Sequence, residues 1–211
     1  MKGKLIIIEG LDGSGKSTQI EQLANRAKQL GKAVRQIKFP NYAEDSSALV
    51  KALAEGGEAA GHTVTEFFLD AMDIHGCKGC FGGRSSRDCP CVQQDGMADI
   101  YPVVKASDVV VLASPLYYWN LSGQLRTAVD RLFALEEGDG NLLRGRGRAS
   151  ALLMAAEGNG FADVLAYYDH LTEHLQWTNL GHILAGGNME AGDIQGKAEL
   201  RQAYDLGHSI R

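Results

Sequence analysis

Short apolar runs bounded by Gly, Asp or Pro alternate along the chain with longer stretches in which apolar residues recur at helical spacing. The short runs predict β-strands at residues 4–9, 33–39, 63–69, 108–113, 149–155 and 182–185. The periodic stretches predict helices at about residues 20–30, 47–60, 97–106, 123–135, 161–176 and 197–210. Strand–helix alternation over the whole length is typical of an α/β fold, here a three-layer, doubly wound parallel sheet of six strands. Because no clear linker interrupts the alternation, we expect a single domain over residues 1–211.

The composition excludes several classes of partner. Apolar residues make up 45% of the 211, which is enough for a sizeable core. The 21 basic and 26 acidic residues give a net charge of −5, whereas a nucleic-acid backbone or an anionic membrane needs a basic face. No apolar run approaches the ~20 residues of a membrane span, and the first residues lack a signal-peptide core. We therefore expect a cytoplasmic protein that binds neither nucleic acid nor a membrane.

A glycine-rich motif stands between the first predicted strand and the first predicted helix. The motif is a full G-x4-G-K-[ST], and its candidate binding residues are Gly10, Asp12, Gly13, Ser14, Gly15, Lys16, Ser17 and Thr18. Glycines let backbone N–H groups close around phosphate oxygens, and the start of the helix adds positive potential. The Lys16 ammonium would reach the terminal phosphates, and the Ser17 hydroxyl would bind magnesium. The motif therefore predicts a phosphate-binding loop.

Residues 1 to about 53 resemble the start of thymidylate kinase. The resemblance rests on KLIIIEGLDGSGKSTQ, on the downstream strand ending in FPNY, and on SSALVK. It implies Mg-ATP at the glycine-rich loop, with Asp70 as the nearest candidate for a carboxylate that holds magnesium. The Asp-Arg pair, nucleobase-binding helix and arginine-bearing lid of that family are not evident further along the chain.

A second group of candidate residues follows the predicted strand at 108–113. Its members are Ser114, Pro115, Leu116, Tyr117, Tyr118, Trp119 and Asn120. The proline fixes a turn, the aromatic side chains offer stacking surface, and the asparagine offers a polar edge. From about residue 47 to residue 211 the chain resembles the NAD(P)H-dependent FMN reductases of the flavodoxin-like superfamily and their iron–sulfur relatives. In that family this loop passes beside the flavin ring.

Two later loops agree with the same site. Glu157, Gly158 and Asn159 follow the strand at 149–155, and residues 186–189 follow the last strand. Ligands of open α/β sheets bind outside the carboxyl ends of the strands, where all three loops are expected. The resemblance implies FMN as cofactor, NAD(P)H as electron donor, a small-molecule electron acceptor and a homodimer. Because the flavin carries the hydride chemistry, we name no catalytic side chain.

The chain thus reads as a chimera of a kinase-like segment, residues 1–53, and a flavodoxin-like segment, residues 54–211. In the favoured arrangement the strands, identified by their first residues, lie in the order 33, 63, 4, 108, 149, 182, which keeps the connections right-handed. The glycine-rich loop then holds the FMN phosphate. In the alternative, strand 33–39 is central and residues 40–47 form the phosphate loop. Two other functions stay open, namely a P-loop ATP-binding protein or nucleotide kinase remnant, and a hybrid fold without activity.

The four cysteines, Cys77, Cys80, Cys89 and Cys91, form the pattern C-x2-C-x8-C-x-C. Thiolates clustered this closely suit zinc or an iron–sulfur cluster. The pattern departs from the compact CxxCxxC of the iron–sulfur flavoproteins. Reduced thiols in a loop that covers the flavin are therefore an equal alternative.

Other polar groups are weaker candidates. His170 and His174 are four residues apart on one predicted helix, yet solvated or capping histidines are more typical of such a pair. Arg144, Arg146 and Arg148 precede the strand at 149–155 and would either contact a dinucleotide phosphate or stay solvated.

Overall fold

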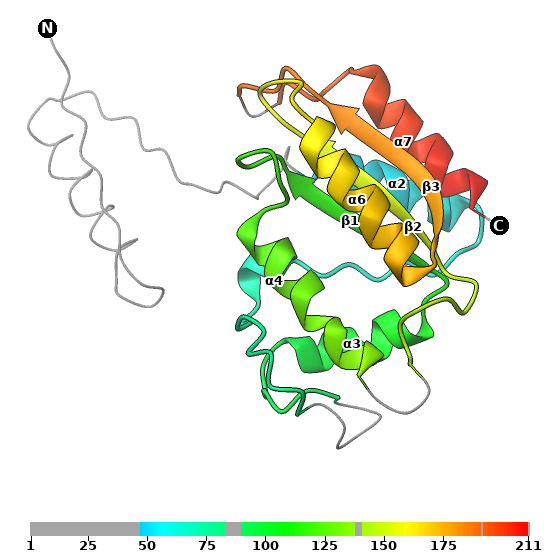
Figure 1. Ribbon diagram of the computed structural model, residues 1–211. Coiled ribbons are helices and arrows are strands. Elements are labelled where there is room, and N and C mark those ends of the chain that lie inside the picture. The colour runs from blue at the N-terminus through cyan, green and yellow to red at the C-terminus, as the bar shows by residue number, and fades with distance from the viewer. Residues whose placement is uncertain (1–46, 83–89, 138–140, 191, 211) are drawn as a thin grey trace, which may run out of the picture. The chain divides into compact units, whose positions relative to one another are not determined.

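The structure is a computed structural model that describes residues 47–82, 90–137, 141–190 and 192–210 (Figure 1). Its sheet contains the parallel strands β1 (Val109–Pro115), β2 (Ala149–Ala155) and β3 (Thr178–Ala185), in the order β1-β2-β3. These strands confirm three of the predictions. β3 begins four residues before the predicted strand, because its first residues are polar and exposed and carry no alternation signal. The predicted strands 4–9 and 33–39 lie outside the described residues.

The described helices lie close to their predicted positions, and the helix predicted at about residues 20–30 lies outside the described residues. The described helices are α2 (Ala48–Ala59), α3 (Met97–Ala106), α4 (Gly123–Arg131), α5 (Phe133–Glu136), α6 (Ala162–Leu175) and α7 (Ala198–Ser209), with a short 3-10 helix, η1 (Leu69–Ala71). The single helix predicted at 123–135 is divided at Leu132 into α4 and α5. Within the parts of the chain that the structure describes, no helix is long and apolar enough to cross a membrane.

The prediction of a strand at residues 63–69 is wrong. Residues 62–68 make no strand ladder, and η1 follows them. Phe67 and Leu69 pack against the core while Phe68 between them is exposed. Alternating burial therefore exists here without strand pairing, because the apolar side chains are covered by helices rather than by a neighbouring strand. With this segment excluded, the described part of the sheet has three strands, and the predictions at 4–9 and 33–39 remain untested.

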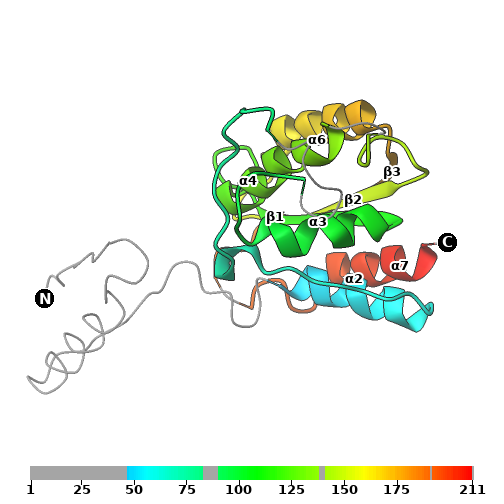
Figure 2. The same ribbon diagram turned by 90° about the horizontal axis from the view of Figure 1, so that it is seen from below.

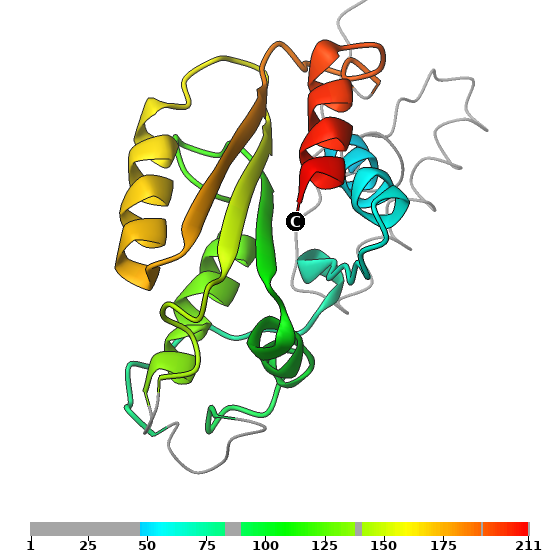
Figure 3. The ribbon, with the colours of Figure 1, turned by 90° about the vertical axis from the view of Figure 1, so that its right-hand side faces the viewer.

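Both faces of the sheet are covered. Figure 2 shows α4 and α6 on one side of the strands and α2 and α7 on the other, and Figure 3 shows the same layers edge-on. Leu112, Leu152 and Met154 point to the α4 and α6 layer, whereas Leu153 and Ile183 pack beneath α2 and α7. Strands covered on both faces read as continuous apolar runs, and this is why periodicity predicted β1 and β2 so closely.

The helices α2 and α7 touch through their backbones. A Cβ atom on Gly56 would overlap the carbonyl of Tyr204, and one on Gly207 would overlap the carbonyl of Leu53. The two helices end together, since His62 Nε2 lies 2.9 Å from the carbonyl of Ile210. They therefore run in the same direction, and α2 begins on the side of the sheet where α7 begins.

Candidate functional site

The three loops that follow the strands meet at one edge of the sheet. We call this the carboxyl edge; it consists of residues 114–120, 157–160 and 186–189. The backbone N–H of Leu116 donates to the carbonyl of Ala155 at 3.2 Å, and that of Ala156 donates to the carbonyl of Ala185 at 2.9 Å. The structure thus brings together the loops that the sequence singled out.

The first loop ends in a tight two-residue turn of aromatic side chains. Tyr117 and Asn120 exchange two backbone hydrogen bonds of 3.0 Å, and Tyr118 and Trp119 between them have φ angles of 47° and 62°. These are the φ signs of a type I′ turn, which favours glycine and asparagine over bulky residues. The side chains of Tyr117, Tyr118 and Trp119 are 51%, 94% and 60% exposed. Backbone strain is thus tolerated at a place where large aromatic surfaces face solvent.

Buried polar groups hold the base of this loop. The Ser114 hydroxyl accepts from the N–H of Ser122 at 2.8 Å and donates to the carbonyl of Pro115 at 2.6 Å. Ser122 in turn caps α4, because its hydroxyl accepts from the N–H of Leu125 at 3.3 Å. The side-chain oxygen of Asn120, which is exposed, accepts from the N–H of Leu121 at 2.8 Å. The polar side chains of the loop therefore shape it from within, and the aromatic rings are left facing outward.

The second and third loops are packed against each other. The N–H of Gly187 donates to the carbonyl of Glu157 and that of Asn188 to the carbonyl of Ala156, both at 2.9 Å. A Cβ atom on Gly186 would overlap the side-chain oxygen of Asn159. Gly160 lies beside the indole of Trp119. A Cβ atom added to Gly160 would be 3.5 Å from the nearest indole atoms. The aromatic turn and the two glycine-bearing loops are therefore one continuous surface.

Asp70 belongs to η1 and lies beside the first turn of α4. The side-chain N–H of Gln124 donates to its Oδ1 at 2.9 Å. The glycine-rich loop, residues 10–18, lies outside the described residues, so the role of Asp70 in holding magnesium beside that loop stays a prediction.

Three of the four cysteines lie around one pocket. Cys77 and Cys80 are exposed, and Cys91 is half-buried. Cys89 lies outside the described residues. In the described ranges, which leave out residues 83–89, no three His, Cys, Asp or Glu side chains are placed to hold a metal ion, and this includes His170 and His174. The nearest partner of His174 is Glu136, at 3.3 Å.

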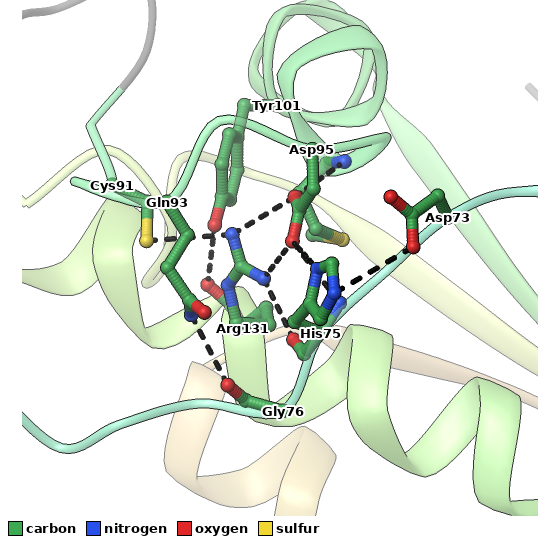
Figure 4. A network of polar contacts seen from close by, with 9 residues as sticks. Asp73, His75, Gly76, Cys91, Gln93, Asp95, Tyr101 and Arg131 are labelled. Atoms are coloured by element: carbon green, nitrogen blue, oxygen red, sulfur yellow. Dashed lines mark hydrogen bonds and ion pairs between the residues drawn. The ribbon is translucent and has the colours of Figure 1, made fainter.

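The same pocket is lined by a buried arginine to which the sequence alone assigned no role (Figure 4). Arg131 makes a two-pronged ion pair with Asp95, with N–O distances of 2.5 and 3.1 Å. Its Nη1 also donates to the carbonyl of His75 at 2.7 Å, and its Nη2 donates to the sulfur of Cys91 at 3.4 Å. Tyr101 donates its hydroxyl to the Arg131 carbonyl at 3.1 Å. Arg131 therefore joins α4 to the cysteine-bearing segment.

Both members of this pair are held in their charged forms. Burial favours the neutral form of Asp95, but hydrogen bonds from Arg131 and from the N–H groups of His75 and Met97 outweigh burial and lower its pKa to about 2. Burial also disfavours the Arg131 cation, yet the bond to Asp95 raises the pKa of Arg131 above its usual range. Only Asp95 carries a local signal in the sequence, as an acidic residue just before a helix, where its carboxylate accepts from the N–H of Met97 at 3.1 Å.

Residues 43–190 match the family described as NADPH-dependent FMN reductase. The chain belongs to this family. The enzyme class predicted from the aromatic loop, an NAD(P)H-dependent FMN oxidoreductase, is confirmed by this match. An iron-sulfur flavoprotein of Archaeoglobus fulgidus is 29% identical over 179 residues, which cover 85% of this chain and 78% of that protein.

The solved structure of RosB with a bound riboflavin-phosphate intermediate superposes on this reductase with a TM-score of 0.62. The superposed region covers 82% of this chain and 71% of the RosB chain. At 14% sequence identity, the similarity supports the α/β fold alone. A thymidylate kinase of Mycobacterium tuberculosis is 41% identical over 75 residues, which cover 34% of this chain and 35% of the kinase. So short a match does not establish the chimera, which stays a prediction.

Arg144, Arg146 and Arg148 of the reductase precede β2 and therefore lie at the opposite edge of the sheet from the three loops. Arg148 is buried and donates to backbone carbonyls, among them that of Lys105 at 2.6 Å and that of Ser107 at 3.0 Å. Its role is to close the amino edge, and it is not placed to contact a dinucleotide at the carboxyl edge.

Proposed function

We propose that the chain binds FMN at the carboxyl edge and passes electrons from NAD(P)H to a small-molecule acceptor. The observation that carries this proposal is the aromatic turn. Tyr117, Tyr118 and Trp119 present exposed rings on a loop anchored by Ser114 and Ser122. Flat aromatic surface beside hydrogen-bonding backbone is what an isoalloxazine ring needs. The residues present therefore fit FMN.

When bound, FMN supplies the hydride and electron chemistry, and the protein supplies binding and orientation. The Tyr117 and Trp119 rings would stack on the flavin. The loops at 157–160 and 186–189, locked together by backbone hydrogen bonds, would present a rigid polar edge. Preorganised loops lower the ordering cost of binding. We further propose a homodimer, for which the family resemblance is the support.

The position of the flavin phosphate has two candidates. One is the glycine-rich loop at residues 10–18, which lies outside the described residues. The other is the start of α2, preceded by residues 40–47. The shared direction of α2 and α7 supports the second, because α7 starts beside the loop at 186–189 and α2 starts on the same side. A helix N-terminus at the carboxyl edge attracts an anion through its free N–H groups and its dipole.

A metal at the cysteines receives less support. Cys91 is occupied by the hydrogen bond from Arg131, and the described residues offer no three converging donors. The described thiols alone do not fit zinc or an iron–sulfur cluster, and we route no electron through either.

The proposal is tested by titrating the purified protein with FMN and following flavin fluorescence. Tyr117→Ala is expected to weaken FMN binding about fivefold, equivalent to about 1 kcal/mol of lost stacking. Phe81→Ala removes an exposed aromatic side chain near the cysteines and serves as the matched control, with unchanged affinity expected. Equal affinities for the Tyr117 variant and the unsubstituted chain would refute the flavin site.

Two further variants locate the phosphate. Ser47→Glu places a carboxylate before α2 and should weaken FMN binding while leaving riboflavin binding unchanged, because riboflavin lacks the phosphate. Lys16→Ala should weaken FMN binding only if the glycine-rich loop holds the phosphate. Thermal stabilisation by Mg-ATP but not by FMN would favour the nucleotide-binding alternative, and no response to either would favour the inactive hybrid.

A further inference from the structure

Lys197 directly precedes α7 and places its ammonium group on the third loop of the carboxyl edge. Its Nζ donates to the carbonyl of Gly186 at 2.7 Å, to the carbonyl of Gly187 at 3.0 Å and to the side-chain oxygen of Asn188 at 2.9 Å. These three acceptors match the three donors of an ammonium group. Lys197 is half-buried, so water competes less for these bonds than it would at an exposed lysine.

Asn188, which accepts from Lys197, also forms hydrogen bonds to the ends of β2 and β3. Its side-chain N–H group donates to the carbonyl of Ala185 at 2.6 Å, and its backbone N–H donates to the carbonyl of Ala156 at 2.9 Å. One asparagine therefore joins the ends of β2 and β3, and Lys197 holds the oxygen of that same side chain. At the far end of the loop, Asp193 accepts from the N–H groups of Met189 and Glu190, both at 2.9 Å.

We propose that Lys197 is a positioning residue for the flavin, which locks residues 186–188 against the second loop and keeps a positive charge beside the ring. This inference rests on the proposed function. The three acceptors in direct contact with the ammonium are uncharged oxygens. The carboxylate that it influences is that of Asp193, whose pKa is lowered by hydrogen bonds from the N–H groups of Glu190 and Met189 and by the Lys197 charge. The reduced flavin carries more negative charge than the oxidised one, and a nearby cation favours the reduced form.

The lock is tested first without flavin, by hydrogen exchange of the backbone amides of Gly187 and Asn188. Lys197→Met removes the charge and keeps the stem, and it should speed exchange of these two amides about tenfold or more, the factor for about 1.4 kcal/mol of lost local stability. Lys51→Met, at an exposed position on α2, is the matched control and should leave both amides unchanged. Unchanged exchange in Lys197→Met would overturn the lock.

The charge is tested with FMN bound. Lys197→Met should bind FMN about tenfold more weakly and shift the flavin midpoint potential to a more negative value, whereas Lys197→Arg, which keeps the charge, should restore the potential toward that of the unsubstituted chain. A purely structural lysine would change affinity and leave the potential alone, and that result would overturn the inference. Absence of FMN binding in the unsubstituted chain instead refutes the proposed function. If Lys197→Met and the unsubstituted chain bind FMN equally well and have the same midpoint potential, the role of Lys197 is refuted and the proposed function still stands.

Discussion

Arg131 and Asp95 lie 36 residues apart in the sequence and form an ion pair whose side chains are 1% and 2% exposed. The pair joins α4 to the segment before α3 and is completed by the carbonyl of His75. Desolvation offsets much of the attraction within such a pair, but removal of one partner leaves a buried charge without compensation. The pair therefore matters more for keeping the cysteine segment in place than for net stability.

The first prediction concerns Asp95→Asn, which leaves the Arg131 cation buried without its counter-charge. We expect a loss of about 3–5 kcal/mol in the free energy of unfolding, measured by urea denaturation at neutral pH. Asp99→Asn, an exposed position in the first turn of α3, is the control and should change stability by less than about 0.5 kcal/mol. A similar small loss for both variants would contradict a role for the pair.

The same pair predicts a dependence on pH. The pKa of Asp95 is about 2 in the folded protein, below its ordinary value of 3.8, so folding favours the ionised carboxylate. Its stabilising contribution is complete above about pH 4 and is lost as the pH falls toward 2. Urea midpoints measured between pH 5 and pH 2 should therefore fall less steeply in Asp95→Asn than in the unsubstituted chain. Parallel curves would show that other groups account for the acid sensitivity.

A second prediction concerns the crossing of α2 and α7. Gly207→Ala adds a methyl group against the carbonyl of Leu53 and should destabilise the fold by about 3 kcal/mol, as overpacking against a backbone does. Gly57→Ala meets only Val64 at 3.5 Å and the Gly207 carbonyl at 3.9 Å, and the better helix propensity of alanine should make it neutral or stabilising. Thermal denaturation compares the two variants, and equal melting temperatures would contradict the close crossing.

The contact between the second and third loops gives a third prediction. Gly186→Ala places a methyl group on the side-chain oxygen of Asn159 and should lower stability by about 1–3 kcal/mol. Asn159→Ala removes the obstacle, so the double variant should recover part of that loss. Gly158→Ala, with no atom within 4 Å of its added Cβ, is the control. Strictly additive effects of the Gly186 and Asn159 changes would show that the two residues do not touch.

A fourth prediction separates stability from binding at the aromatic turn. Tyr118→Gly relieves a positive φ of 47° and should leave the free energy of unfolding unchanged or raise it by up to about 1 kcal/mol. The same variant should bind FMN more weakly, because an aromatic surface is lost. Denaturation and FMN titration of one preparation give both values. A destabilised protein with unchanged FMN affinity would mean that Tyr118 serves the fold.

The sequence could predict much of the architecture because the relevant signals are local. The apolar runs at β1 and β2 are bounded by turn residues and covered on both faces, and the helices carry their own spacing of apolar positions. The same reasoning went wrong at residues 63–69, because alternation reports which side chains are buried and not whether a neighbouring strand donates hydrogen bonds.

The sequence by itself determined the α/β class, the three loops at the ends of parallel strands and the reductase family, since each depends on residues near one another along the chain. The tertiary structure alone decided the partners of Arg131, the backbone contact of Gly207 with α2, and the attachment of Lys197 to the loop at 186–188. These contacts depend on distance and direction in space. Charged residues, including lysines, and glycines recur throughout the sequence, and only the folded chain brings particular ones into contact.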